Sequence, residues 1–169
     1  MTDVSPPFGL TQRHTRGKVR RISLGDFPMP ISQKIRDLVL GAWGKDAVCL
    51  LGTIGKDGPN ISPKGSMIVF DDEHLAYWER SKRKALENVA YDPRVVVIYS
   101  DMRTWREKGM KSPALRFYGP AKGHESGPIK AAIFSKLLKR EQEHVGADTG
   151  VGVLIKLTRA EDLRGNPLA

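Results

Sequence analysis

The chain has 169 residues, with 28 lysines and arginines against 19 aspartates and glutamates, and a formal net charge of +9. Its length suits one domain with a sizeable core, and an apolar content of 40% is too high for a wholly disordered chain. No apolar run approaches the roughly 20 residues that span a bilayer, and the single cysteine, Cys49, cannot form an intramolecular disulfide. The sequence therefore favours a folded cytoplasmic protein with no membrane partner.

The excess positive charge is concentrated near the N-terminus. Residues 11–21 contain five cations and no carboxylate, and the segment around them is rich in proline and glycine and lacks a helical apolar stripe. We predict that residues 1–30 form a basic arm and that residues 31–169 form the folded domain. The arm is interpreted either as solvated chain that aids solubility or as a segment that binds an anion.

The first half of the domain predicts one helix followed by three strands. Apolar residues recur at helical spacing from Gln33 to Trp43, and Ser32 can cap that helix. Strands are expected over residues 48–55, 60–70 and 74–78. The Asp57-Gly58 pair between the first two supports a tight hairpin turn, because both residues accept a positive φ.

The second half predicts two more helices and three more strands. Helices are expected over residues 82–91 and 128–143, and strands over residues 94–99, 114–121 and 151–158. Residues 101–112 read as an exposed loop or a short irregular helix. Strands linked by hairpins, with only a few helices between them, indicate a mainly β fold. The expected architecture is a six-stranded antiparallel sheet closed into a barrel. No glycine fingerprint of a Rossmann dinucleotide site is present.

The expected helix start after residue 78 carries an unusual charge cluster. Ser81 is a natural N-cap, and four cations surround it: Arg80, Lys82, Arg83 and Lys84. Cations oppose the positive end of a helix dipole, and a bound phosphate would resolve that conflict. The alternative is a solvated basic first turn, partly compensated by Glu79 and Glu87.

A second unusual segment lies in the strand that returns from the hairpin. Ser62, Lys64 and Ser66 alternate with other residues and should share one face, while Pro63 and Gly65 interrupt the strand pattern. Such an interruption indicates either a backbone that approaches a ligand closely or an edge strand with a bulge.

These two segments carry a resemblance to a known family. The hairpin Leu51-Gly52-Thr53-Ile54-Gly55-Lys56-Asp57-Gly58-Pro59-Asn60, the Ser62-Pro63-Lys64-Gly65 strand, and Arg83-Lys84-Ala85 ahead of Asp92-Pro93-Arg94-Val95 resemble the pyridoxamine 5'-phosphate oxidase-related split barrels that bind flavin nucleotides. The resemblance covers about residues 32 to 158.

The resemblance implies a homodimeric six-stranded split barrel with FMN in the grooves between the two subunits. By the same resemblance, Arg83 and Lys84 would hold the FMN phosphate at the start of the helix capped by Ser81. Tyr77 and Trp78 would line the cofactor. The strand that contains Ser62, Pro63, Lys64, Gly65 and Ser66 would run along the isoalloxazine ring and the ribityl chain.

The sequence departs from the true pyridoxamine phosphate oxidases of that family. It lacks their Arg-x-Val-Leu-Leu-Lys flavin strand and has no tryptophan after Trp105, so vitamin B6 oxidation is not expected. Arg116, in the expected strand over residues 114–121, is interpreted either as a residue that reaches the flavin or its partner ligand or as a surface arginine.

The remaining chemistry-bearing residues predict no further site. Cys49 lies in an apolar run and is expected to be an inert core thiol, and the four histidines lack metal-site spacing. The leading function is an FMN-dependent oxidoreductase that passes electrons between a small-molecule donor and acceptor. The alternatives are a flavin carrier or sensor without turnover, a deazaflavin- or haem-binding split barrel, and, less favoured, a basic barrel that binds nucleic acid.

Overall fold

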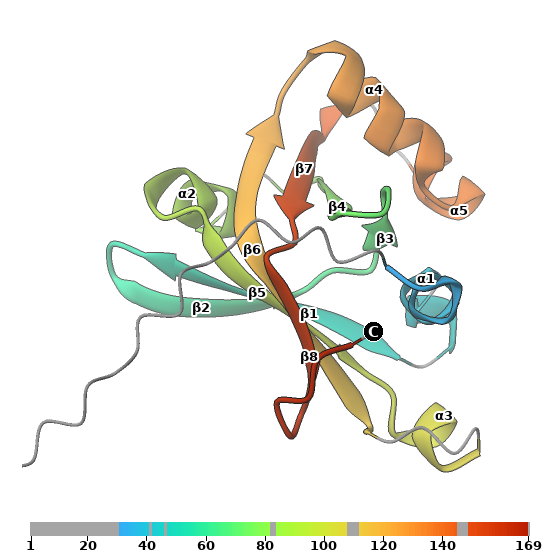
Figure 1. Ribbon diagram of the computed structural model, residues 1–169. Coiled ribbons are helices and arrows are strands. Elements are labelled where there is room, and N and C mark those ends of the chain that lie inside the picture. Colours follow the sequence, from blue (N-terminus) through green and yellow to red (C-terminus); the bar gives the residue numbers. More distant parts are fainter. Residues whose placement is uncertain are drawn as a thin grey trace, which may run out of the picture.

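The structure is a computed structural model that describes residues 31–40, 42–45, 47–81, 84–107, 112–144 and 149–168 (Figure 1). The predicted basic arm, residues 1–30, lies outside the described residues, as do Lys82 and Arg83 of the basic helix start.

The core of the fold is one antiparallel sheet of eight strands, with the order β2-β1-β5-β6-β7-β4-β3 and with β8 paired to β6. The strands are β1 (Val48–Gly55), β2 (Gly58–Pro63), β3 (Ile68–Val69), β4 (His74–Glu79), β5 (Arg94–Ser100), β6 (Ala114–His124), β7 (Val151–Lys156) and β8 (Arg159–Asp162). This confirms the predicted mainly antiparallel β fold with a few helices.

Two differences turn the six expected strands into eight. The strand expected over residues 60–70 is divided into β2 and β3, because the chain leaves the ladder between Lys64 and Met67. The other addition, β8, follows β7 after a two-residue connection and pairs with the first half of β6. The alternation of β8 is too short to be recognised in the sequence.

The strand β6 joins the two halves of the sheet. It pairs along one side with β5, from Arg94↔Pro120 to Ser100↔Ala114. On its other side its first half pairs with β8 and its second half with β7. Figure 1 shows β6 running the length of the molecule between these partners.

The helices lie around the sheet. They are α1 (Gln33–Val39), the 3-10 helix η1 (Ala42–Lys45), α2 (Lys84–Tyr91), α3 (Met102–Glu107), α4 (Gly127–Lys136) and α5 (Lys139–Gln142). The first predicted helix ends earlier than expected, at Val39. The predicted helix over residues 128–143 is divided in two, because Leu137 and Leu138 both adopt extended ψ angles. None of the described helices is both long and apolar enough to cross a membrane.

The strand β4 separates two apolar clusters. Leu75 and Tyr77 point into the barrel and belong to its main core, together with Leu51, Tyr99 and Phe117. Ala76 and Trp78 point to the other face of β4. There they pack beneath α4 with Ile68, Ile133 and Leu137. The alternation along β4 therefore gives each face of this strand its own cluster.

Candidate functional site

A buried ion pair lies directly after strand β2, where the chain leaves the sheet before β3 begins. Lys64 follows β2 directly, and its backbone N–H donates to the carbonyl oxygen of Cys49 at 2.8 Å. Its Nζ donates to Oε2 of Glu79, the last residue of β4. Only 9% of the Lys64 side chain and 5% of the Glu79 side chain are exposed. Removing either partner would leave an uncompensated buried charge.

The second oxygen of Glu79 links this pair to the basic helix start. Its Oε1 accepts hydrogen bonds from Oγ of Ser81 at 2.6 Å and from the Ser81 backbone N–H at 3.2 Å. Burial by itself would raise the pKa of Glu79, but hydrogen bonds from Lys64 and Ser81, with the charge of Lys64, hold it below its ordinary value. Glu79 is therefore an anion that ties together the two segments singled out in the sequence.

The serine at the end of the break is fixed against β4. Oγ of Ser66 accepts a hydrogen bond from the backbone N–H of Trp78 at 3.0 Å and donates to the Trp78 carbonyl oxygen at 3.1 Å. The side chain thus replaces ladder bonds that the interrupted strand cannot make. The predicted interruption at Pro63 and Gly65 is observed, and it is held in one geometry by Lys64 and Ser66.

Two buried hydroxyl groups near these segments have no hydrogen-bond partner among the described residues: those of Ser62 and Tyr77. Tyr77 is fully buried, and Nζ of Lys64 lies 5.0 Å from the centroid of its ring. Burial and, second, the charge of Glu79 raise the pKa of Tyr77, so its hydroxyl remains protonated. Buried polar groups are nearly always hydrogen-bonded, so within the described part of the chain these two hydroxyls are unused donors or acceptors.

Trp78 lies apart from Tyr77, on the other face of β4. Its ring packs against Phe134 of α4 at a centroid distance of 5.0 Å, and Nζ of Lys130 lies 5.5 Å from its centroid. These three residues, with Gly127 and Ala131, line a depression of about 210 Å³. Tyr77 and Trp78, predicted to line one cofactor, therefore face different clusters within one subunit.

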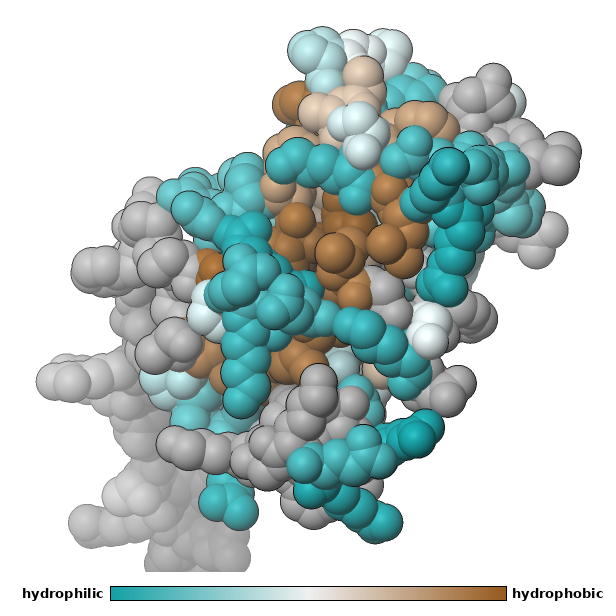
Figure 2. Space-filling view, turned by 90° about the vertical axis from the view of Figure 1, so that its right-hand side faces the viewer, coloured by the Kyte–Doolittle hydropathy of each residue, from teal (hydrophilic) through white to brown (hydrophobic). Residues whose placement is uncertain are grey.

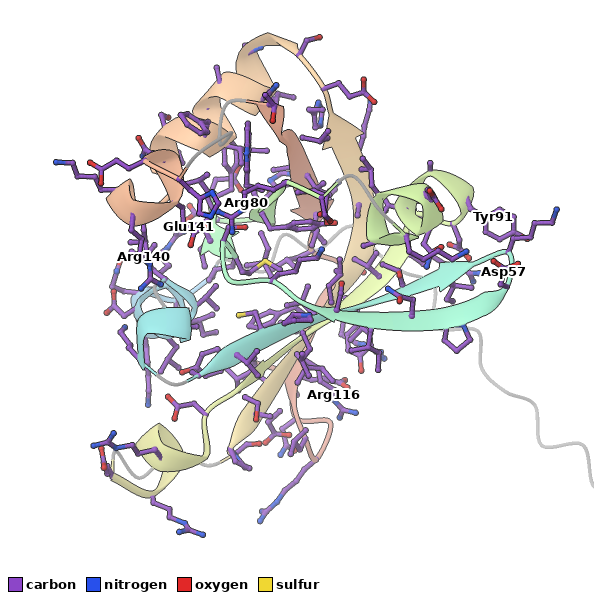
Figure 3. All side chains as sticks on the ribbon, turned by 180° about the vertical axis from the view of Figure 1, so that it is seen from behind. Asp57, Arg80, Tyr91, Arg116, Arg140 and Glu141 are labelled. Carbon is purple, nitrogen blue, oxygen red and sulfur yellow. The ribbon has the colours of Figure 1, made fainter. Side chains whose placement is uncertain are left out.

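The described cations of the helix start are paired with carboxylates from distant parts of the chain. Nζ of Lys84 donates to Oδ2 of Asp57, in the β1–β2 turn, at 2.6 Å. Arg80 contacts Glu141 of α5 at 3.1 Å, and Figure 3 shows these two side chains meeting. Glu79 and Glu87, the carboxylates nearest in sequence, were the expected partners of these cations, and Asp57 and Glu141 were not predicted. No local signal in the sequence marks such long-range pairs.

Arg116 lies on a different part of the sheet from the Lys64–Glu79 pair. Its Nη2 contacts Oε1 of Glu161 at 3.0 Å and donates to the carbonyl oxygens of Asp162 and Leu163 at 3.0 and 3.2 Å. Its Nε is buried and has no partner among the described residues. In Figure 3 Arg116 lies well apart from Arg80 and from Asp57. Within one subunit it does not join the other predicted cofactor residues.

The sheet around Arg116 presents an apolar face that is partly exposed. Ile61 of β2 is 71% exposed and Ile54 of β1 is 44% exposed. The register places Gly52 beside both Ile61 and Val96, and Leu50 beside Ile98. We call this surface the apolar sheet face, and its members are Leu50, Ile54, Ile61, Val96, Ile98 and Tyr118. Figure 2 shows an apolar area bordered by hydrophilic side chains on the side of the molecule that lies at the right of Figure 1.

Thiol and metal chemistry find no support among the residues that the structure describes. Cys49 is 1% exposed, and burial raises the pKa of its thiol to about 12. No group of three or more histidine, cysteine, aspartate or glutamate side chains in the described ranges is placed to hold a metal ion.

The comparisons with solved structures support the fold. Over 82% of this chain and 98% of the other, it is similar to HupZ of Group A Streptococcus, with 24% identity and a TM-score of 0.63. An F420 reductase matches 78% of this chain and 98% of its own at 16% identity and a TM-score of 0.54. A pyridoxamine 5'-phosphate oxidase-related, FMN binding protein from Nostoc punctiforme matches 71% of this chain and 76% of its own, at 12% identity and a TM-score of 0.52.

The family comparison covers most of the chain. No curated protein matches it. The family model described as pyridoxamine 5'-phosphate oxidase matches residues 31–161, from the residue before the cap of α1 to within β8. This range includes the break after β2, the ion pair Lys64–Glu79, the basic helix start and Arg116. The chain therefore belongs to the pyridoxamine 5'-phosphate oxidase family.

Proposed function

We propose that the protein is an FMN-dependent oxidoreductase, in which FMN lies between two subunits and passes electrons from a small-molecule donor to a small-molecule acceptor. The observation that carries the proposal is the Lys64–Glu79–Ser81 network. It joins the interrupted strand, expected to follow the flavin ring, to the helix start, expected to hold the phosphate. Two segments 15 or more residues apart in sequence thus form one rigid unit.

The polar groups of the interrupted strand fit a flavin ring. The Ser62 hydroxyl is buried and has no partner among the residues that the structure describes, and a flavin offers both hydrogen-bond donors and acceptors along its polar edge. Glu79 holds Lys64, and the backbone of Trp78 holds Ser66. Both side chains therefore fix the strand and do not have to change position when a flavin binds. A preorganised site of this kind binds with a smaller entropy loss.

The helix start fits a phosphate. Lys84 is paired with Asp57, but both side chains are largely exposed, at 47% and 74%, and exposed ion pairs contribute roughly 0 to 1 kcal/mol. Exchanging Asp57 for a phosphate therefore costs little. Free backbone N–H groups and the helix dipole at the start of α2 add to the attraction.

The apolar sheet face fits a second copy of the chain. Contiguous apolar surface of this kind is unusual on a monomer and is typical of an interface. Arg116 lies within it, and its unpartnered Nε would find an acceptor either on the second subunit or on the ligand between them. A symmetric dimer would also bring Arg116 of one subunit toward the proposed FMN site of the other subunit.

FMN, when bound, supplies the hydride and electron chemistry. The residues of this chain have the supporting tasks. Arg83 and Lys84 bind the phosphate, Ser62 and the backbone of the break orient the ring, and the apolar sheet face excludes water from the interface. Glu79 neutralises Lys64, so the pair presents a fixed dipole rather than a net charge near the ring.

Purification tests the proposal directly. We expect a yellow dimeric protein that releases FMN on denaturation, identified by chromatography of the pigment. Exchange of both phosphate ligands, Arg83→Ala with Lys84→Ala, should weaken FMN binding at least about tenfold. The control Lys34→Ala, an exposed lysine on α1, should leave it unchanged. A colourless protein that does not take up added FMN would contradict the proposal.

Further measurements separate the alternatives. A protein that retains FMN but does not oxidise nicotinamide cofactors with any acceptor is a carrier or sensor. Preferential uptake of F420, or a Soret band after haem addition, would identify a deazaflavin- or haem-binding relative. Binding of nucleic acid that falls steeply with salt would support the basic-barrel alternative.

A further inference from the structure

The outer face of the sheet beside α4 gathers basic side chains from three strands. The register of β4, β7 and β6 sets His74 opposite Lys156, and sets Leu154 opposite Lys122. It also places His124 opposite Gly152. Directly opposed residues of antiparallel strands point to the same face. Ile133 of α4 packs with Ala76 and Trp78 in one part of this face, and the basic residues lie beside that part.

These residues line one groove of about 580 Å³, which we call the basic groove. Its basic members are His74, Lys122, His124 and Lys156. Leu154 of β7, and Ile129 at the start of α4, form part of the apolar wall of the groove. The volume lies within the range of about 300–1,000 Å³ that is typical of small-molecule sites. The groove lies on the face of β4 opposite to Leu75, Tyr77 and the core of the barrel.

The basic side chains of the groove are only partly paired with carboxylates among the residues that the structure describes. Nδ1 of His74 contacts Oδ1 of Asp71 at 2.7 Å, which fixes the ring and leaves Nε2 for another partner. Lys122 is exposed and makes no ion pair with the residues that the structure describes. Burial and, second, the charge of Lys122 lower the pKa of His124. The surroundings of His124 thus disfavour a further positive charge in the absence of an anion.

We propose that the basic groove binds a small carboxylate with a flat or branched apolar body, such as an aromatic carboxylate. The carboxylate would accept charge-assisted hydrogen bonds from Lys122 and from the imidazoles. The apolar body would lie against Leu154 and Ile129, which a bare inorganic anion would leave unused. The site is additional to the proposed flavin site and does not depend on it.

The test uses 2-naphthoate as the probe and 2-naphthamide, which has the same rings without the charge, as its matched control. Titration calorimetry is performed on the purified full chain, before and after saturation with FMN. We expect 2-naphthoate to bind at least about fivefold more tightly than the amide, because a hydrogen bond to a charged group is stronger than a neutral one. FMN should leave both affinities unchanged.

Two variants locate the site. Lys122→Gln should weaken 2-naphthoate binding at least about fivefold, whereas Lys34→Gln, which removes the same charge from α1, should not change it. In ¹⁵N spectra of the histidine rings, 2-naphthoate should shift the signals of His74 and His124, each assigned from its glutamine variant. Equal affinity for the amide, an unchanged Lys122→Gln variant, or no binding at millimolar probe would each overturn the proposal.

Discussion

The side-chain amide of Asn88, in α2, donates a hydrogen bond to the hydroxyl of Thr53, in β1, at 3.0 Å. Both residues are buried. A Cβ added to Gly55, two residues after Thr53, would lie 2.1 Å from Oδ1 of Asn88. The helix α2, which begins at the proposed phosphate site, is therefore attached to β1 by a buried hydrogen bond. This contact leaves no room for a side chain at Gly55.

Asn88→Ala should lower the free energy of unfolding by roughly 1–3 kcal/mol, because it leaves the Thr53 hydroxyl buried with only a weak contact. Urea denaturation followed by circular dichroism measures the change. The control Glu87→Ala, at the exposed neighbouring position, should stay within about 0.5 kcal/mol of the parent. Equal stability of the two variants would show that the contact does not hold α2.

Gly119→Ala should destabilise the protein by more than about 1 kcal/mol. A Cβ at this position would lie 1.7 Å from the carbonyl oxygen of Lys156, which is backbone and cannot rotate away. Thermal unfolding checks the effect. Gly123→Ala is the matched control in the same strand, since its Cβ would meet only side-chain atoms, of Leu86 at 3.1 Å and of Val151 at 3.5 Å. A Gly119→Ala protein as stable as Gly123→Ala would contradict the close approach of β6 to the end of β7.

Acid should release the Lys64–Glu79 pair and destabilise the fold. The pKa of Glu79 in the folded state lies below its ordinary value, so its stabilising contribution is present above the unfolded pKa of about 4.3 and is lost as the pH falls through the folded pKa. We expect Glu79→Gln to remove part of the decline in melting temperature below about pH 4.3. The Glu107→Gln control, on the exposed surface of α3, should retain the full decline.

Asp57→Asn should strengthen FMN binding by about twofold to fivefold. The substitution frees Lys84 from its exposed ion pair and removes a negative charge that opposes the phosphate. Fluorescence quenching of FMN measures the dissociation constant. Asp37→Asn on α1 serves as the control with the same charge change. Weaker binding in Asp57→Asn would mean that the pair positions Lys84 and does not compete with the phosphate.

Cys49 should resist alkylation in the native protein. Only the thiolate reacts, and burial raises the pKa of this thiol to about 12. Mass spectrometry after iodoacetamide treatment near neutral pH should show no native modification and complete modification in denaturant. Rapid native labelling would indicate that β1 opens on the timescale of the reaction.

Much of the fold follows from local patterns in the sequence. The apolar run from Val48 predicted β1, and the Asp57-Gly58 pair predicted the turn to β2, where Gly58 has a φ of 115°. The division of α4 from α5 could not be predicted, because the apolar stripe continues through Leu137. The backbone turns at that residue to bury it at 4% exposure beneath α4. Tertiary packing overrides periodicity there.

The candidate site follows from the sequence only in part. Alternation predicted that Ser62, Lys64 and Ser66 share one face of the strand, but only the fold shows that Glu79 holds Lys64 and Ser81 together. Likewise, the sequence shows that Arg80 and Lys84 oppose the positive end of the helix dipole. Their partners Glu141 and Asp57, however, come from elements far along the chain. Contacts across long sequence separations leave no local pattern.

The pairing of β4 with β7 has a consequence for how the protein is made. Residues 74–79 pair along their whole length with residues 151–156, and their other neighbour in the sheet is the two-residue strand β3. Until β7 emerges from the ribosome, β4 therefore has only β3 beside it. Leu75 and Tyr77 therefore lack their β7 neighbours until late in synthesis. A ribosome stalled before Val151 should hold a protease-sensitive nascent chain, and protection should appear late and in one step, when β7 closes against β4 and β6.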